Sequence, residues 1–239
     1  MKSLSAAILS LGLAFTAWSA SPAAAEEQAG PVVVELFTSQ GCSSCPPADA
    51  LMHDLAGRSD VIALALHVDY WDYIGWKDEF AIPGHTARQK AYARNGGRRM
   101  IYTPQMIVMG QESIVGAKAM KLADLIAAHK ALPAPATVLI HRQGPRVTVD
   151  LAPRLSPSGG PFDVQLVRFD PHRTVKITRG ENAGRTLDYA NIVLGWHGLG
   201  TWDGVAAVTL SADLPDDMPV AVLVQRRDTG AIAVAGRSD

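Results

Sequence analysis

Hydrophobic residues follow two different patterns along the chain, and the change between them falls near residue 135. Before it, apolar runs at 32–37, interrupted by Glu35, and at 61–68 are typical of strands buried on both faces of a parallel sheet. Between and after them, apolar residues recur every three or four positions, which predicts helices after residue 45, over about 86–94 and near 122–129. Short strands are predicted at 105–109 and 113–115.

The second pattern begins after a proline-containing linker at 133–135 and consists of short runs with alternating apolar residues. Turns rich in Gly, Pro, Asp and Asn separate about eight such runs, which is typical of a β-sandwich. The first part has the element order of a thioredoxin fold. We therefore predict an α/β thioredoxin-like domain over residues 31–132, followed by an all-β sandwich-like domain over 136–239.

Composition and the first residues bear on the location of the protein. The 239 residues are 48% hydrophobic, with a net charge of −1, so nothing indicates a nucleic-acid partner. Lys2, an apolar run over 4–18 and small residues up to Ala25 predict a cleaved signal peptide over 1–25 and a periplasmic or secreted protein. The alternative is a retained membrane anchor, although the run is shorter than the ~20 residues that span a bilayer. We expect no membrane span in the mature chain.

The two cysteines of the chain, Cys42 and Cys45, lie between the first strand and the first helix. In an exported protein such a pair can be oxidised and remain so. Because a disulfide that closes a two-residue gap stabilises little, the spacing favours chemistry over stapling. We predict that Cys42 is the more accessible, attacking sulfur and Cys45 the resolving one. Pro46 and Pro47 suit a first helical turn, so the helix is expected to begin near Cys45.

Three further residues are candidates for chemistry at the same place. Thr103-Pro104 precedes the third strand, where a cis proline facing the cysteines would leave the Thr103 backbone free to bind a substrate; a trans proline opening an edge strand is the alternative. Glu35 is a carboxylate in an apolar strand. Burial would raise its pKa and allow it to accept a proton from the second cysteine, but a structural pair with a basic residue explains it equally well.

Aromatic residues after the second strand could line a substrate groove. Trp71 and Trp76 are the substrate-binding candidates among them, although such clusters are more often a small core. His67, Met106 and Met109 raise a Cu(I) site as a further possibility, with core packing as the commoner explanation. The polar turn at 179–185 is interpreted as a hairpin with charged flanks, or else as a recognition loop.

Four motifs together resemble a family of secreted bacterial proteins known as domain of unknown function 1223. They are VVELFTSQGCSSCPPAD, HVDYWDYIGWKDEFA, YTPQMIV and RGENAGRTL, and they cover nearly the whole mature chain. The resemblance implies a thioredoxin-like domain followed by a β-rich domain, without an assigned activity. The chain differs from thioredoxin in having Gly41 where thioredoxin has tryptophan, and two prolines after the second cysteine.

Two functions are compatible with these features. The leading hypothesis is an exported thiol-disulfide oxidoreductase that acts on protein or small-molecule thiols through Cys42 and Cys45, without a cofactor or resident metal, and with a redox partner protein as a further expectation. The alternative is a non-enzymatic protein that binds Cu(I) or zinc at the cysteines, or an envelope partner through the β domain.

Overall fold

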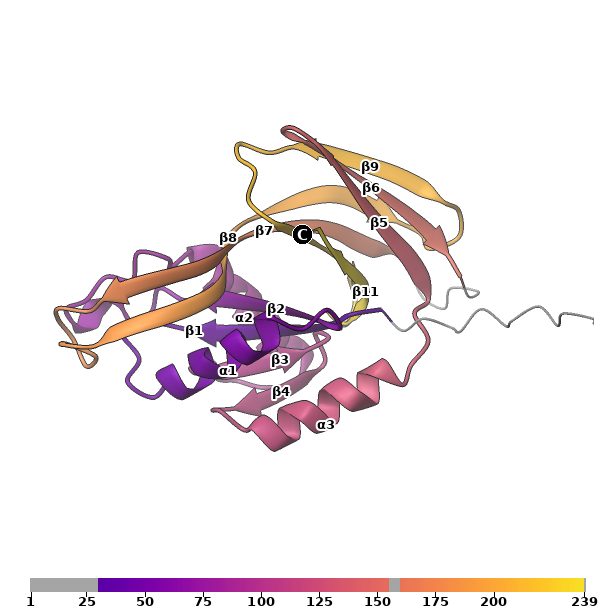
Figure 1. The fold of residues 1–239 in the computed structure, drawn as a ribbon. Coiled ribbons are helices and arrows are strands. Elements are labelled where there is room, and N and C mark those ends of the chain that lie inside the picture. The colour runs from indigo at the N-terminus through magenta and orange to yellow at the C-terminus, as the bar shows by residue number, and fades with distance from the viewer. Residues whose placement is uncertain (1–29, 155–159, 239) are drawn as a thin grey trace, which may run out of the picture.

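The described part of the chain contains one eight-stranded mixed sheet, one three-stranded antiparallel sheet and three α-helices (Figure 1). The computed structural model describes residues 30–154 and 160–238, and the predicted signal peptide at 1–25 lies outside them. The elements in chain order are β1 (Val32–Thr38), α1 (Pro46–Ala56), β2 (Val61–His67), the 3₁₀-helix η1 (Asp72–Ile74), α2 (Pro83–Asn95), β3 (Gln105–Val108), β4 (Glu112–Val115), α3 (Ala119–Lys130), β5 (Ala136–Gln143), β6 (Arg146–Pro153), β7 (Phe162–Lys176), β8 (Thr186–Trp202), β9 (Val208–Asp213), β10 (Val220–Arg226) and β11 (Ile232–Arg237). In the part of the chain so described, no helix is long and apolar enough to cross a membrane.

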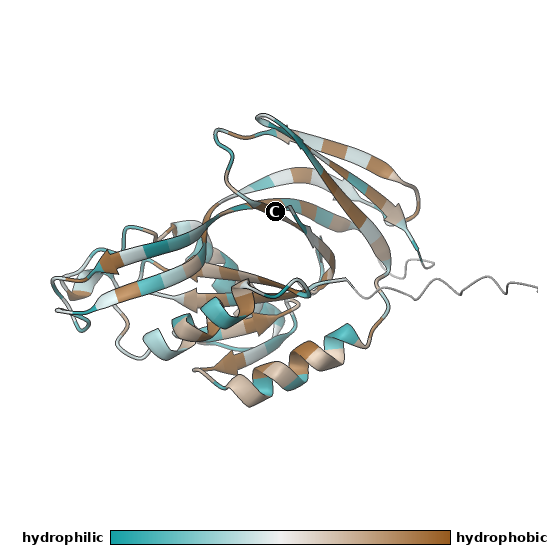
Figure 2. Cartoon of the chain, viewed as in Figure 1, coloured by the Kyte–Doolittle hydropathy of each residue, from teal (hydrophilic) through white to brown (hydrophobic). Residues whose placement is uncertain are grey.

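The two apolar runs of the first half form a parallel pair at the centre of the large sheet. β1 and β2 align from Val32 opposite Val61 to Thr38 opposite His67, and both strands are buried at every position. β3 pairs antiparallel with β1, and β4 pairs with β3. These strands are mostly apolar in Figure 2, as the continuous runs predict. The parallel arrangement predicted from them is therefore confirmed.

The large sheet contains strands from both predicted domains. Its order is β11-β10-β7-β8-β2-β1-β3-β4, and β8 joins β2 in parallel, with Ala65 opposite Ile192. Asn191 supports this join, since its side chain donates a hydrogen bond to the Ala63 carbonyl at 2.9 Å. The division at residue 135 stays a prediction, and the hydrogen-bonded sheet continues across it.

The strands of the second half form two facing β layers. Apolar residues of the small sheet β5-β6-β9 pack against one face of β7, β10 and β11; buried members include Val147, Val149, Val164, Leu166 and Val222. β7 is one long strand instead of two short ones, because its pairing with β8 passes through bulges instead of ending. Bulges bend a strand, and the curved β7–β8 hairpin extends from the second half to α1 (Figure 1).

Candidate active site

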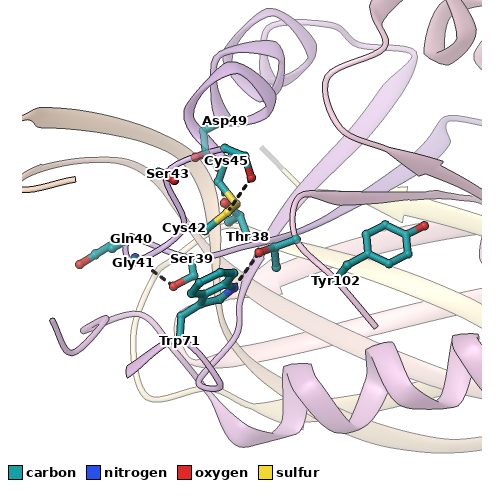
Figure 3. The surroundings of a disulfide bond; sticks show 12 residues. Thr38, Ser39, Gln40, Gly41, Cys42, Ser43, Cys45, Asp49, Trp71 and Tyr102 are labelled. Carbon is teal, nitrogen blue, oxygen red and sulfur yellow. Dashed lines mark hydrogen bonds between the residues drawn. A yellow bond between two sulfur atoms is a disulfide. The ribbon is translucent and has the colours of Figure 1, made fainter. Parts of the chain in front are cut away.

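The two cysteines form a disulfide between the end of β1 and the start of α1 (Figure 3). Their Cα atoms are 5.4 Å apart, and Cys45 is the N-cap residue of the helix, followed by proline in the first turn. The prediction that the helix begins near Cys45 is confirmed. The positive end of the helix dipole therefore acts on Cys45 more than on Cys42.

Both cysteines are buried, and the expected difference in accessibility between Cys42 and Cys45 stays a prediction. Cys42 is 1% exposed and Cys45 is 0% exposed, whereas Ser43 and Ser44 between them lie at the surface. The expectation took account only of the turn and the helix. Segments distant in sequence cover the turn as well, and they are described below.

Trp71 lies beside the disulfide turn and is held there by Thr103. Its indole Nε1 donates a hydrogen bond to Thr103 Oγ1 at 2.8 Å, and Figure 3 shows the ring below the cysteines. A Cβ atom on Gly41 would approach the Trp71 Cβ to 3.2 Å, so the glycine leaves room for this tryptophan. The Thr103–Pro104 bond is cis, as predicted, and Pro104 is buried. A contact between Pro104 and the cysteines stays a prediction.

Asp49, a buried carboxyl group one helical turn after Cys45, is not among the site residues predicted from the sequence. Residues four apart on a helix share a face, and the Asp49 N–H donates to the Cys45 carbonyl at 3.1 Å. One carboxyl oxygen accepts a hydrogen bond from Thr38 Oγ1 at 2.7 Å; the other has no partner among the described residues. Burial raises the pKa of Asp49 to about 7. The spacing Cys-x-x-x-Asp was the available signal.

A second buried carboxylate, Asp78, connects the disulfide turn to His67. One of its oxygens accepts hydrogen bonds from the Gln40 backbone N–H and from His67 Nδ1, both at 2.8 Å. Burial opposes its ionisation, but His67 and backbone N–H groups outweigh burial and lower the pKa of Asp78. Asp78 is therefore a fixed negative charge on the side of the turn opposite to solvent.

Glu35 is fully buried and lies in a polar network apart from Asp49. Its carboxylate is paired with the Arg88 guanidinium at 2.6 and 3.1 Å and accepts a hydrogen bond from the Tyr92 hydroxyl at 2.5 Å. Arg88 also donates to Gln165 and Gln225 of the second half. These contacts correspond to the structural pair considered above. The proton-relay role of Glu35 stays a prediction without a contact that favours it.

Trp76 connects the turn to the β7–β8 hairpin. Its Nε1 donates a hydrogen bond to Gln40 Oε1 at 2.7 Å. Its ring packs, with Phe80, on a small core formed by Val175, Ile177, Leu187, Tyr189 and Ile192. Trp71 and Trp76 thus flank the disulfide turn, and Trp76 has mainly a packing role.

The polar turn at 179–185, between β7 and β8, lies directly on the disulfide turn. The side-chain amide of Asn182 donates hydrogen bonds to the carbonyl oxygens of Gln40, at 2.9 Å, and Cys42, at 3.0 Å. The Ser43 N–H donates to the carboxylate of Glu181 at 3.3 Å. Because 140 residues separate Asn182 from Cys42, the spacing of residues along the chain does not predict this contact.

Comparison with known proteins identifies the family. The model of a protein family of unknown function, DUF1223, matches residues 33–225. The chain belongs to the DUF1223 family. The crystal structure of protein AGR_C_4864 from Agrobacterium tumefaciens is similar, with 33% identity and a TM-score of 0.75 over 86% of this chain and 92% of that one. HBP35 of Porphyromonas gingivalis has a similar fold, with 18% identity and a TM-score of 0.63 over 87% and 74% of the two chains. No curated protein matches.

A cavity of about 270 Å³ in this DUF1223 protein reaches Asp49 from the side of the hairpin. Its lining includes His53 of α1 and Arg185 of the 179–185 turn. The buried carboxyl group thus borders a space where water and protons can enter. The same space separates the first turn of α1 from the start of β8.

The copper ligands considered in the sequence analysis are not brought together in this DUF1223 protein. His67 is bound to Asp78, and the Met109 sulfur accepts a hydrogen bond from the Val33 N–H at the other end of β1 from the cysteines. Met106 is a core residue opposite Leu36. Within residues 30–154 and 160–238, no three His, Cys, Asp or Glu side chains are grouped to hold a metal ion.

Proposed function

We propose that this DUF1223 protein is an exported thiol-disulfide oxidoreductase with a thioredoxin-like N-terminal half, acting on protein or small-molecule thiols. The observation that carries the proposal is the Cys42–Cys45 disulfide at the entrance of α1, with the buried Asp49 carboxyl group one turn further on. The order of β1, α1 and β2, followed by the antiparallel pair β3 and β4 and then α3, supports the thioredoxin-like assignment. The signal-like segment 1–25 supports export to an oxidising compartment.

The proposed reaction transfers two electrons from a substrate dithiol to the disulfide. A substrate thiolate attacks Cys42 Sγ, the S–S bond breaks, and Cys45 leaves as a thiolate. The second substrate thiolate then attacks the mixed disulfide and releases Cys42. The substrate leaves as a disulfide, and the enzyme holds two thiols. The helix N-terminus favours this direction of attack, because it stabilises the thiolate on Cys45.

Asp49 is the proton donor and acceptor that we propose for Cys45. With a pKa of about 7, this carboxyl group is partly protonated at neutral pH. Its acid form can protonate the leaving Cys45 thiolate, and its carboxylate can take the proton back when Cys45 acts as the resolving thiol. The cavity lined by Asp49 and His53 gives this proton a route to solvent. Asp49 thereby takes the role that the sequence suggested for Glu35.

Substrate positioning is assigned to Thr103-Pro104, before β3, together with Trp71, which follows β2. Trp71 touches both sides of this arrangement: its indole binds Thr103, and its Cβ lies next to Gly41. A substrate chain at the disulfide would therefore meet Trp71 and the Thr103 backbone together.

Trapping of the mixed disulfide tests the proposal. In the reverse reaction the Cys42 thiolate attacks a substrate disulfide, one substrate sulfur leaves as a thiolate, and Cys45 resolves the mixed disulfide; Cys45→Ala should therefore accumulate a covalent adduct between Cys42 and the substrate. Cys42→Ala is the matched control and should trap almost nothing. Non-reducing electrophoresis and mass spectrometry of both variants, expressed with residues 1–25 present, give the readout.

The metal-binding alternative predicts a different result in the same experiment. Either substitution would then lower the affinity for Cu(I) or zinc, and neither would give an adduct. Equal trapping by the two variants, or none by either, contradicts the oxidoreductase proposal. Metal analysis of the reduced wild-type protein separates the two non-enzymatic alternatives. Bound Cu(I) or zinc would indicate a metal site at the cysteines, whereas a protein that binds a partner only through its β half would contain no metal.

A further inference from the structure

The hairpin tip, defined as residues 178–185, contains one buried residue; the others are exposed except Gly180, which is half-buried. Asn182 is 1% exposed, whereas Glu181 and Ala183 on either side are at the surface. Its amide group donates to the carbonyl oxygens of Gln40 and Cys42. Arg185 Nη1 donates to Asn182 Oδ1 at 2.9 Å, which fixes the orientation of the amide.

The hairpin tip is attached to the rest of the protein by few contacts besides those of Asn182. The arm behind it is anchored by the small core that includes Ile177 and Leu187. Beyond that core, the tip is supported by the weak contact of Glu181 with Ser43 and by the packing of Gly180 on Trp76. Gly180 has a φ of 74°, which favours glycine, and a Cβ atom there would lie 3.2 Å from the Trp76 Cβ. Segments with few buried contacts open locally without unfolding of the whole protein.

Attack on a disulfide requires direct contact between the incoming thiolate and a sulfur atom. With Cys42 at 1% and Cys45 at 0% exposure, neither residue offers that contact in the closed arrangement. Asn182 fixes the backbone of the disulfide turn at Gln40 and Cys42, and Cys42 can become exposed only if this part of the backbone moves or loses its cover. The turn and the tip must therefore separate, or move together, before the first step of thiol exchange.

We propose that the hairpin tip is a cover over the redox site and that Asn182 is its latch, so that opening of the tip sets the rate at which thiols reach Cys42. This inference concerns access to the site and rests on the proposed function. It makes Asn182 a positioning residue, contributed to a site in the first half by the second half of the chain.

Reduction of the native disulfide by dithiothreitol measures access directly. One dithiothreitol thiolate attacks Cys42 Sγ, Cys45 leaves as a thiolate, and the second thiolate closes the oxidised reagent and releases Cys42. The mature protein is mixed with excess reagent, quenched with acid, alkylated and weighed by mass spectrometry. Asn182→Asp keeps the size of the side chain and replaces the donating group by an oxygen that the two carbonyls repel. We expect reduction about tenfold faster or more, equivalent to about 1.4 kcal/mol of opening free energy.

Asn191→Asp is the matched control for loss of a buried amide. Asn191 lies on β8, is 5% exposed and donates to the carbonyl of Ala63 instead of the disulfide turn. Its variant should be reduced at the wild-type rate within about twofold, a factor that corresponds to about 0.4 kcal/mol. Asn182→Ala is a milder second variant, used if Asn182→Asp does not fold, and it should also accelerate reduction.

The dependence of the rate on urea distinguishes a latch from general destabilisation. Local opening exposes little surface, so reduction of the Asn182 variants should change little with urea below the unfolding transition. Unchanged rates in both Asn182 variants, equal acceleration in Asn191→Asp, or a steep urea dependence would each overturn the proposal. The two proposals can fail separately, because dithiothreitol is not a physiological substrate. Faster reduction of the Asn182 variants, combined with no trapped adduct in Cys45→Ala, would support the cover and refute the oxidoreductase.

Discussion

Replacing Asp49 by asparagine should change how the stability of the protein depends on pH. The asparagine side chain keeps an oxygen that can accept the hydrogen bond from Thr38, but it carries no titratable proton. In the wild type, burial raises the pKa of Asp49 from 3.8 to about 7; His67 and His53 oppose this rise and Asp78 adds to it. The folded protein therefore binds the Asp49 proton more tightly than the unfolded chain does.

The sign and size of the effect follow from these two pKa values. Below the ordinary value of 3.8, Asp49 is protonated in both states and burial of its charge costs nothing. As the pH rises above 3.8, the unfolded chain loses the Asp49 proton while the folded protein still retains it, so folding becomes less favourable. Above about 7 the folded protein loses the proton as well and buries a charge. A difference of about three pKa units corresponds to roughly 4 kcal/mol, which the wild type should lose between about pH 4 and 8.

Urea denaturation of the oxidised proteins across that pH range measures the difference. The free energy of unfolding of Asp49→Asn, relative to the wild type, should increase by roughly 4 kcal/mol from about pH 4 to pH 8. The substituted amide can cost 1–3 kcal/mol or so if its N–H₂ group lacks an acceptor, but this offset does not vary with pH. Asp54→Asn, on the exposed side of the same helix, is the control and should follow the wild-type curve.

The same variant tests the role of Asp49 in thiol exchange. Without the carboxyl group, exchange through Cys45 should be slower near neutral pH by about a hundredfold, the lower end of the range for loss of a general acid or base. Parallel stability curves for wild type and Asp49→Asn, within about 1 kcal/mol, would refute the argument from burial. An unchanged exchange rate would remove Asp49 from the mechanism and leave it a structural residue.

Two further predictions concern residues around the site. Glu35→Gln leaves the Arg88 charge buried without its partner, so urea denaturation should show that the free energy of unfolding falls by about 3 kcal/mol or more. The rate of thiol exchange at pH 7 should stay within about twofold of the wild type. A much slower exchange would instead support the proton-relay role of Glu35. Trp71→Phe removes the hydrogen bond to Thr103, which should cost about 1 kcal/mol of stability. Steady-state kinetics with a peptide dithiol should then show a higher KM with little change in kcat, and a wild-type KM would make Trp71 a packing residue only.

Much of the local structure could be predicted from the sequence, because the signals are local. Continuous apolar runs identified β1 and β2 as parallel buried strands, and their register leaves each with both faces covered. The prolines that follow the second cysteine indicated a helix that begins near Cys45, and α1 begins at Pro46. Asp49 was within reach of the same reasoning, since its spacing of four from Cys45 already places both residues on one helix face.

The surroundings of the disulfide were decided only by the tertiary structure. Glu35 could pair with any basic residue, and only the packing of α2 on β1 selects Arg88. Asn182 reaches Cys42 because bulges curve a hairpin that begins in the second half and joins the sheet of the first. Periodicity predicts which face of a helix or strand is buried, but not which distant segment buries it. Such contacts depend on strand curvature and register, which accumulate over many residues. For that reason the sequence located the cysteines at a helix entrance, while their burial beneath Asn182 depends on the fold.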